Sequence, residues 1–226
     1  MRQRESSLRP TRIATACVVL AAGAASMPAL ATDGYFSHGY GVKQSGMGGA
    51  STALAQDSFG GANNPASMVW AGARMDLGLT WFRPERYAER SGAGIPSLNG
   101  KVDSGSTDFF VPEFGYNAMI SSALSLGVSV YGNGGMNTNY PQGNFNCGGG
   151  PANMLCGSGN LGVDLMQLIV APTLSYKLNS QHSVGASLLL GFQQFKAYGL
   201  QAFDNAPGFP AFTGAPGSVT NNGYAH

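Results

Sequence analysis

The sequence is most informative in two short stretches rich in small residues, Gly46-Met47-Gly48-Gly49-Ala50 and Asn63-Asn64-Pro65-Ala66. Side chains of this size bury too little apolar surface to form a core of their own. We therefore expect residues 32–70 to form a backbone-dominated plug that lies inside a larger structure. Short helical turns are predicted at 50–56 and 65–70, the second with Asn64 as its N-cap and Pro65 in its first turn.

Residues 1–31 are predicted to be a signal peptide. They begin with a basic region containing four arginines, continue with an apolar run at 13–25, and end at Ala29-Leu30-Ala31, which fits a cleavage site. The apolar run is shorter than the about 20 residues that a membrane helix needs, so a retained anchor is the less favoured alternative. The mature chain is expected to start at Thr32.

The composition of the mature chain limits its class. Removal of residues 1–31 lowers Lys plus Arg from 12 to 8 and Asp plus Glu from 11 to 10, which leaves a formal charge of −2. Because the chain has no basic stripe, nucleic acid is not an expected partner. Charged residues make up only 10% of the chain, against about 25% in soluble domains. No apolar run of about 20 residues follows the signal, which leaves a transmembrane β-barrel or a glycine-rich extracellular β-protein.

Two cysteines remain in the mature chain, Cys147 and Cys156. An exported pair this close in sequence favours a disulfide, with two free thiols as the alternative. The bridge would close a ring of about ten residues and stabilise it by about 2.5–3 kcal/mol on the chain-entropy model. A zinc site is not expected, because no histidine lies near these cysteines in the sequence. No cofactor is predicted.

After residue 74 the apolar residues recur at every second position. One face of each segment carries large apolar side chains, and the other carries mainly Gly, Ser, Thr, Asn and Gln. This pattern predicts an all-β chain with about five antiparallel transmembrane strands. The predicted strands are 75–82, 109–120, 123–131, 163–176 and 184–195. Glu113 and Asn117 lie on the polar face of the second strand, so they are expected to face the lumen, either as ordinary lining or as gating contacts to the plug.

The predicted connections alternate in length. Residues 121–122 and 179–182 form short turns, whereas residues 83–107 and 132–162 form long, glycine-rich loops. Outer-membrane barrels have short periplasmic turns and long extracellular loops. Because loop length did not enter the assignment of strands, it supports the barrel independently.

Several of these segments match a known family. The matching residues are Gly41-Val42-Lys43-Gln44-Ser45-Gly46-Met47-Gly48-Gly49-Ala50, Asn64-Pro65-Ala66, Val111-Pro112-Glu113-Phe114-Gly115-Tyr116 and the segment 127–131. With them the chain resembles the outer-membrane long-chain fatty acid transporters (FadL/TodX-like, OMPP1), a family that also includes aromatic-hydrocarbon uptake porins. The resemblance extends over nearly all of residues 32–195.

The resemblance implies a barrel of about fourteen strands that is closed by an N-terminal hatch, in the outer membrane of a Gram-negative bacterium. It implies a passive, hatch-gated uptake channel for hydrophobic molecules, long-chain fatty acids first and aromatic hydrocarbons second, in contact with outer-membrane lipid and without catalysis. A lateral opening is expected near Gly127, Gly132, Gly134 and Gly135. The implied hatch and gating residues are Gly46, Met47, Gly48, Gly49, Asn64, Pro65 and Ala66.

The number of predicted strands is smaller than the resemblance implies. An open sheet in lipid exposes unpaired N–H and C=O groups, at a cost of about several kcal/mol each. Residues 71–226 are therefore expected to be the N-terminal part of a longer barrel.

Two other classes of function fit the sequence less well. Residues 46–49 lack the preceding strand and the Lys-Ser/Thr of a phosphate-binding loop, and no serine-centred motif supports a hydrolase, so an enzyme is not expected. An extracellular structural or adhesive β-protein is the main alternative. Membrane fractionation combined with heat-modifiable gel mobility would separate it from a barrel.

Overall fold

The computed structural model describes residues 34, 36–54, 56–148, 150–203 and 223–226. The chain divides into one unit, Met1–Gly34, and another, Tyr35–His226. All elements below belong to the second unit. The predicted signal peptide, residues 1–31, lies outside the described residues.

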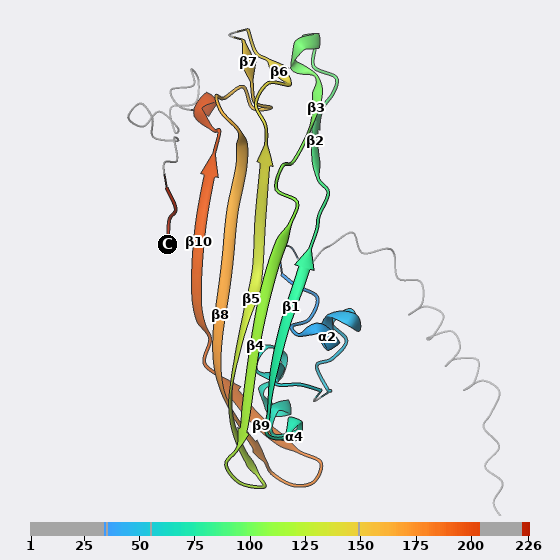
Figure 1. Cartoon of the computed structure of the whole chain (residues 1–226), viewed down its shortest axis with the longest axis vertical. Coiled ribbons are helices and arrows are strands. Elements are labelled where there is room, and N and C mark those ends of the chain that lie inside the picture. The colour runs from blue at the N-terminus through green and yellow to red at the C-terminus, as the bar shows by residue number, and fades with distance from the viewer. Residues whose placement is uncertain (1–33, 35, 55, 149, 204–222) are drawn as a thin grey trace, which may run out of the picture. The chain divides into compact units, whose positions relative to one another are not determined.

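The main body is a six-stranded antiparallel sheet (Figure 1). The strand order is β1-β4-β5-β8-β10, and β9 also pairs with β8. The prediction of antiparallel strands is confirmed; among the described residues, the two outermost strands do not pair with each other. The strands are β1 (Arg74–Phe82), β4 (Phe109–Met119), β5 (Leu124–Tyr140), β8 (Leu161–Lys177), β9 (Ser183–Ser187) and β10 (Leu190–Tyr198).

The two faces of the sheet differ as the alternating sequence predicts. On the outer face large apolar side chains are exposed, with Leu77 at 74% and Phe110 at 66%. On the inner face the polar side chains of Asn117, Ser125 and Ser129 are fully buried. A water-soluble sandwich would show the reverse, because its apolar face would be packed against a second sheet. The exposed apolar face is the arrangement of strands that face lipid.

The third predicted strand, 123–131, is much longer in the structure. β5 continues to Tyr140 and pairs with β8, with a bulge between Gly132 and Gly134 that leaves Asn133 without a cross-strand partner. The predicted start of a loop at residue 132 was wrong. The run Gly132-Asn133-Gly134-Gly135 consists of turn-forming residues, and a bulge interrupts the alternation that marks a strand.

The fifth predicted strand, 184–195, is divided into β9 and β10. Leu188 donates its N–H to the carbonyl of Pro172 at 3.0 Å, but Pro172 has no N–H with which to return the bond. The ladder therefore lacks one hydrogen bond at this pair. The strand is interrupted there, although β9 and β10 pair with β8 in the same register.

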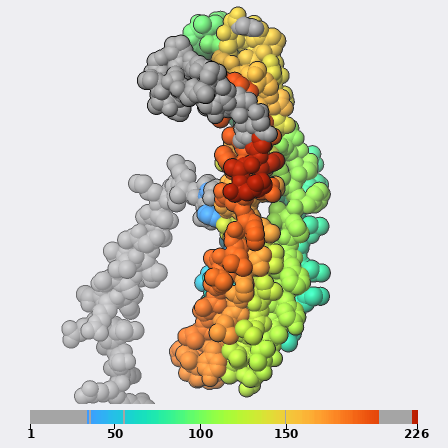
Figure 2. Space-filling view, turned by 90° about the vertical axis from the view of Figure 1, so that its left-hand side faces the viewer, coloured from blue at the N-terminus to red at the C-terminus, as the bar shows by residue number. Residues whose placement is uncertain are grey.

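Residues 223–226 lie against β10 (Figure 2). Phe195 and Ala225 exchange two backbone hydrogen bonds of 2.8 and 2.9 Å. This antiparallel bridge lies on the edge of β10 that faces away from β8.

Both predicted long loops contain hairpins, which lie at the end of the sheet opposite the short turns (Figure 1). The prediction of loops there was therefore incomplete. The short turns are closed by hydrogen bonds of 2.9 Å from Ile120 N–H to the Leu124 carbonyl and from Leu178 N–H to the His182 carbonyl. The hairpin elements are β2 (Tyr87–Arg90), η2 (Pro96–Leu98), β3 (Gly100–Asp103), β6 (Phe145–Asn146) and β7 (Pro151–Ala152), and η3 (Gln201–Phe203) follows β10.

Residues 36–54 and 56–72 form what we call the N-terminal layer, which packs on the inner face near the short turns (Figure 1). Its elements are α2 (Val42–Gly46), α3 (Gly60–Asn63), η1 (Pro65–Ser67) and α4 (Met68–Ala71). The helical turn predicted at 65–70 is confirmed. The turn predicted at 50–56 is wrong, because the described residues of that range are not helical. Within the described part of the chain, no helix is long and apolar enough to cross a membrane.

Candidate functional site

The N-terminal layer is held on the sheet mainly through its backbone. Four serine hydroxyls of the inner face donate hydrogen bonds of 2.7–3.0 Å to carbonyl groups of the layer. Serine has a short side chain, so these bonds bring the backbone of the layer close to the strands. The pairs are Ser129 with the Ser58 carbonyl, Ser175 and Ser183 with the Ala66 carbonyl, and Ser187 with the Gly61 carbonyl.

The Asn64-Pro65-Ala66 motif is the most closely fitted part of this interface. Asn64 accepts a bond from the Ala66 N–H at 3.2 Å, which fixes the start of η1, and its amide donates to the Thr52 carbonyl at 2.8 Å. A Cβ atom on Gly185 of β9 would stand 2.5 Å from the Ala66 nitrogen and from the Pro65 carbonyl carbon. Only a glycine therefore allows β9 to approach the motif this closely.

Glu113 and Asn117, which the sequence assigned to the inner face, both contact the layer. The carboxylate of Glu113 is 8% exposed and accepts the Gly41 N–H, with 3.2 Å to each oxygen. The side-chain amide of Asn117 donates to the carbonyls of Met68 and Gly72, each at 2.8 Å. These bonds tie both ends of the layer to β4.

The turn at 46–49, which the sequence grouped with the hatch residues, lies apart from this interface. Gly46, Met47 and Gly48 are exposed. No atom lies within 4 Å of the place where a Cβ on Gly46 or Gly48 would stand, and Gly49 packs on the backbone of His38 within the layer. The structure therefore does not bring this turn together with Asn64, Pro65 and Ala66 on the sheet.

An ion pair on β1 anchors the layer and was not singled out from the sequence. The Arg74 guanidinium contacts Asp76 at 2.6 and 2.7 Å. Asp76 also accepts the backbone N–H and the hydroxyl of Ser58 at 2.9 and 2.7 Å. Because residues two apart on a strand lie on the same face, the spacing of Arg74 and Asp76 in the sequence could have indicated this ion pair.

A second buried network holds the layer together internally. Gln44 is 2% exposed. It accepts the hydroxyl of Ser51 at 2.9 Å and the amide of Asn63, and it donates to Asp57 at 3.3 Å. Asn63 therefore bonds within the layer and not to the sheet.

The pairing of β4 with β5 stops part of the way along the sheet. Their register runs from Met119 and Ser125 to Phe114 and Val130, whereas β5 continues to pair with β8 as far as Tyr140. We call this point the fork. Beyond the fork the side chain of Val111 lies close to β5, since a Cβ on Gly132 would stand 2.8 Å from the Val111 Cγ1.

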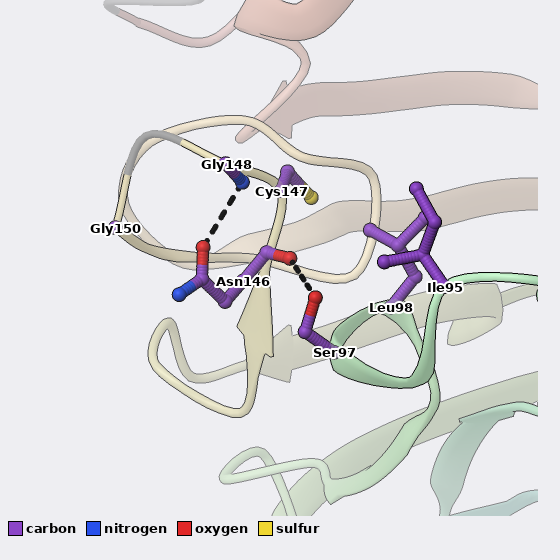
Figure 3. A pocket seen from close by; sticks show the side chains of 7 residues that line it. All are labelled: Ile95, Ser97, Leu98, Asn146, Cys147, Gly148 and Gly150. Atoms are coloured by element: carbon purple, nitrogen blue, oxygen red, sulfur yellow. Dashed lines mark hydrogen bonds between the residues drawn. The ribbon is translucent and has the colours of Figure 1, made fainter.

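The two loop hairpins contact each other at the far end of the sheet, where they line an open pocket of about 390 Å³ (Figure 3). Ser97 donates to the Asn146 carbonyl at 2.9 Å, and the Arg90 guanidinium lies 5.7 Å from the ring centre of Phe145. Cys147 and Cys156 form a disulfide with Cα atoms 5.6 Å apart. The bridge links the residue after β6 to the segment that follows β7.

Removal of this disulfide is expected to loosen the β6–β7 hairpin without affecting the sheet. Closure of a ring of about ten residues stabilises by about 2.5–3 kcal/mol, which corresponds to about a hundredfold change in local opening. Phe145 is 1% exposed, so chymotrypsin should cleave there much faster when Cys147→Ser and Cys156→Ser are combined. Cleavage at Tyr87, which is already 59% exposed, is the internal control. Equal protection of Phe145 in both proteins would contradict the prediction.

Over residues 18–216 the chain matches the sequence model of a family described as outer membrane protein transport protein (OMPP1/FadL/TodX). No curated protein sequence matches the chain. Among solved structures, the chain is similar to the crystal structure of the P. putida toluene transporter TodX, with a TM-score of 0.52 and 22% sequence identity. The match covers 71% of this chain and 37% of TodX, so the chain spans little more than a third of that structure. At this identity the likeness concerns the fold alone.

Proposed function

The chain belongs to the OMPP1/FadL/TodX family of outer-membrane transport proteins, and from this premise we propose that it supplies the hatch and first strands of a channel for hydrophobic molecules. Members of the family reside in the outer membrane of Gram-negative bacteria and are transporters, not enzymes. In this proposal residues 1–31 are the signal peptide and 32–70 the hatch. Residues 71–226 are the first part of a barrel of about fourteen strands.

The observation that carries the proposal is that one face of the sheet is apolar and exposed, whereas the other is polar and buried. Leu77 and Phe110 are exposed on the outer face, while Asn117 and Ser129 are buried under the N-terminal layer. Exposed rows of large apolar side chains are stable in contact with lipid but not with water. This favours the channel over an extracellular adhesive β-protein.

Long-chain fatty acids are the proposed first substrates and aromatic hydrocarbons the second. The resemblance of segments 41–50 and 64–66 to the fatty acid transporters supports the first choice. TodX is a toluene transporter, which supports the second. Uptake of oleate and toluene by cells that produce the protein, compared with cells that lack it, separates the two. No uptake of either would contradict the proposal.

The proposed route passes the hatch and leaves the barrel sideways at the fork between β4 and β5. Gly132, Gly134 and Gly135 lie beside the fork, but Gly127 pairs with Asn117 below it. Transfer of apolar surface into the bilayer supplies the driving force. The route needs no cofactor.

Substitutions that make the Asn64-Pro65-Ala66 motif more flexible test whether the hatch gates uptake. Glycine at positions 65 and 66 gives the unbound segment more conformational freedom, at about 0.4–1 kcal/mol for each such change, so Pro65→Gly with Ala66→Gly should change oleate uptake by about four- to thirtyfold. Uptake is measured at equal surface level and equal heat-modifiable mobility. Pro96→Gly is the matched control, because Pro96 also begins a 3₁₀ turn but lies in a loop. Unchanged uptake would remove the gating role of the motif.

A further inference from the structure

A polar pocket of about 330 Å³ lies on the outer face of the sheet, toward the loop hairpins. Three strands and Tyr224 contribute to it. Asp164 on β8 pairs with Asn137 on β5 and with Lys196 on β10. The ring of Tyr224 lies beside Lys196. Asp164 precedes Met166, an exposed residue of the outer face, by two positions, so this polar row also points outward.

The pocket lies where the apolar band of the outer face ends. On β8 every outward residue from Met166 to Tyr176 is apolar or aromatic. Such a stretch is about 34 Å long along a strand, or about 26 Å across a membrane at a tilt of about 40°. The apolar band of outer-membrane barrels is about 25 Å tall, and their long loops are extracellular. Asp164 is the next outward position, so the pocket stands at the level of the headgroups of the outer leaflet.

The aromatic side chains of the pocket are held in place by hydrogen bonds. The Tyr198 hydroxyl donates to the Thr138 carbonyl at 2.7 Å. A Cβ on Gly162 would stand 2.7 Å from the Cζ atom of Tyr198, so this ring lies over Gly162 and crosses β8 from β10 to β5. The Tyr224 hydroxyl donates to Asp164 at 2.5 Å. The two rings are therefore fixed apolar surfaces between polar groups.

Lys196 supplies the cationic group of the pocket. Its Nζ lies 5.5 Å from the ring centre of Tyr224 and 5.7 Å from that of Tyr198. In the described part of the chain Lys196 forms no ion pair, and the carboxylate of its neighbour Asp164 accepts the Tyr224 hydroxyl instead. The side-chain amide of Asn137 has no hydrogen-bond partner among the described residues. The ammonium and the amide are therefore available to a ligand.

We propose that this pocket binds the phosphorylated sugar headgroup of a glycolipid in the outer leaflet. The faces of Tyr198 and Tyr224 suit the C–H groups of a sugar ring, because the face of an aromatic ring is negatively polarised. The amide of Asn137 bonds to sugar hydroxyls, and Lys196 pairs with a phosphate. The acyl chains of the same molecule lie along the apolar band, from which a free sugar phosphate would gain nothing. The inference rests on the barrel of the proposed function but not on transport.

Titration with lipid A, a phosphorylated disaccharide that carries acyl chains, tests the site. Binding is measured by native mass spectrometry of the detergent-solubilised protein without divalent cations, and heat-modifiable mobility shows that each variant is folded. Lys196→Gln should weaken binding about fivefold, the effect of one basic residue at a membrane surface. Asn137→Ala should weaken it about two- to tenfold, the effect of one hydrogen bond.

Lys177→Gln is the matched control. The Nζ of Lys177 also lies near an aromatic ring, 4.4 Å from the ring centre of Trp70, but at the short-turn end of β8. This variant should bind lipid A as the parent does. An equal loss in Lys177→Gln and Lys196→Gln overturns the site. So does equally tight binding of phosphatidylglycerol, which has a phosphate but no sugar.

Two further comparisons separate the lipid from other ligands and the site from the channel. Displacement of lipid A by millimolar inorganic phosphate or glucosamine phosphate would assign the pocket to a free anion and overturn the lipid as its occupant. Because the measurement is lipid binding, its failure leaves the proposed uptake function intact. Conversely, a lack of oleate and toluene uptake together with the expected loss in Lys196→Gln overturns the channel and supports the lipid site.

Discussion

Gly185→Val is expected to increase the fraction of molecules in which the N-terminal layer is displaced from the sheet. The valine Cβ would stand 2.5 Å from two backbone atoms of Pro65 and Ala66, and backbone atoms cannot swing aside as a side chain end can. Overpacking of this kind costs about 1–3 kcal/mol. The bonds from Ser175 and Ser183 to the Ala66 carbonyl oppose this displacement, each by about 0.5–1.5 kcal/mol. The layer, not the strand register, should give way, because β8 holds β9 through five residue pairs.

The measurement is trypsin cleavage after Lys43, an exposed residue of the layer, in detergent-solubilised protein. Cleavage of a transiently open segment follows the population of the open form, so Gly185→Val should raise its rate by about five- to 140-fold. Gly191→Val is the control on the same hairpin, since the nearest atom to its Cβ is the end of the Ile169 side chain at 3.4 Å. If Gly185→Val resists trypsin as well as Gly191→Val does, the layer is not seated on β9.

The faces of the sheet could be predicted from the sequence because lipid imposes a simple rule. A strand with one side in hydrocarbon must place a large apolar residue at every second position. Leu77, Phe110 and Leu174 follow this rule, and all three are exposed. The same alternation placed Glu113 and Asn117 on the opposite side. Residue type and spacing alone are enough for this assignment.

The contacts of the N-terminal layer could not be predicted in the same way. A serine hydroxyl that bonds to a backbone carbonyl places no demand on the partner's side chain, so the pairing of Ser187 with Gly61 leaves no trace in residue types. The resemblance implied an opening near Gly132, Gly134 and Gly135, but residue types alone did not show the fork, for a different reason. Its bulged residue, Asn133, lies in a glycine run that is typical of a loop, and its partner Tyr40 is 93 residues away. The residue types at 46–49 do not show where this turn lies either, and Gly46, Met47 and Gly48 are exposed in the N-terminal layer.

Aspartate at position 117 is expected to be the most destabilising polar substitution on the inner face. Asn117 is fully buried, and its side-chain nitrogen donates to two carbonyls of the layer at 2.8 Å. Asn117→Asp keeps the shape of the side chain but turns this donor into an acceptor, so a carboxylate oxygen would face two carbonyl oxygens. A buried charge left without a partner costs about 3–5 kcal/mol. Both carbonyls also lose their donors, which leaves the end of α4 without an attachment to β4.

The free energy of unfolding in urea, followed by heat-modifiable mobility, measures this effect. Gln193→Glu is the matched control, an amide-to-carboxylate change on the same face of the sheet. Gln193 accepts a bond from Gln167, which a carboxylate can also accept, and it is exposed, so its variant should stay within about 0.5 kcal/mol of the parent. In Asn117→Asp the N-terminal layer should instead lose most of its contact with β4, while the strands still pair. If Asn117→Asp is as stable as Gln193→Glu, the Asn117 amide does not hold the layer. A buried amide that donates two hydrogen bonds cannot be replaced by a carboxylate without a loss of stability.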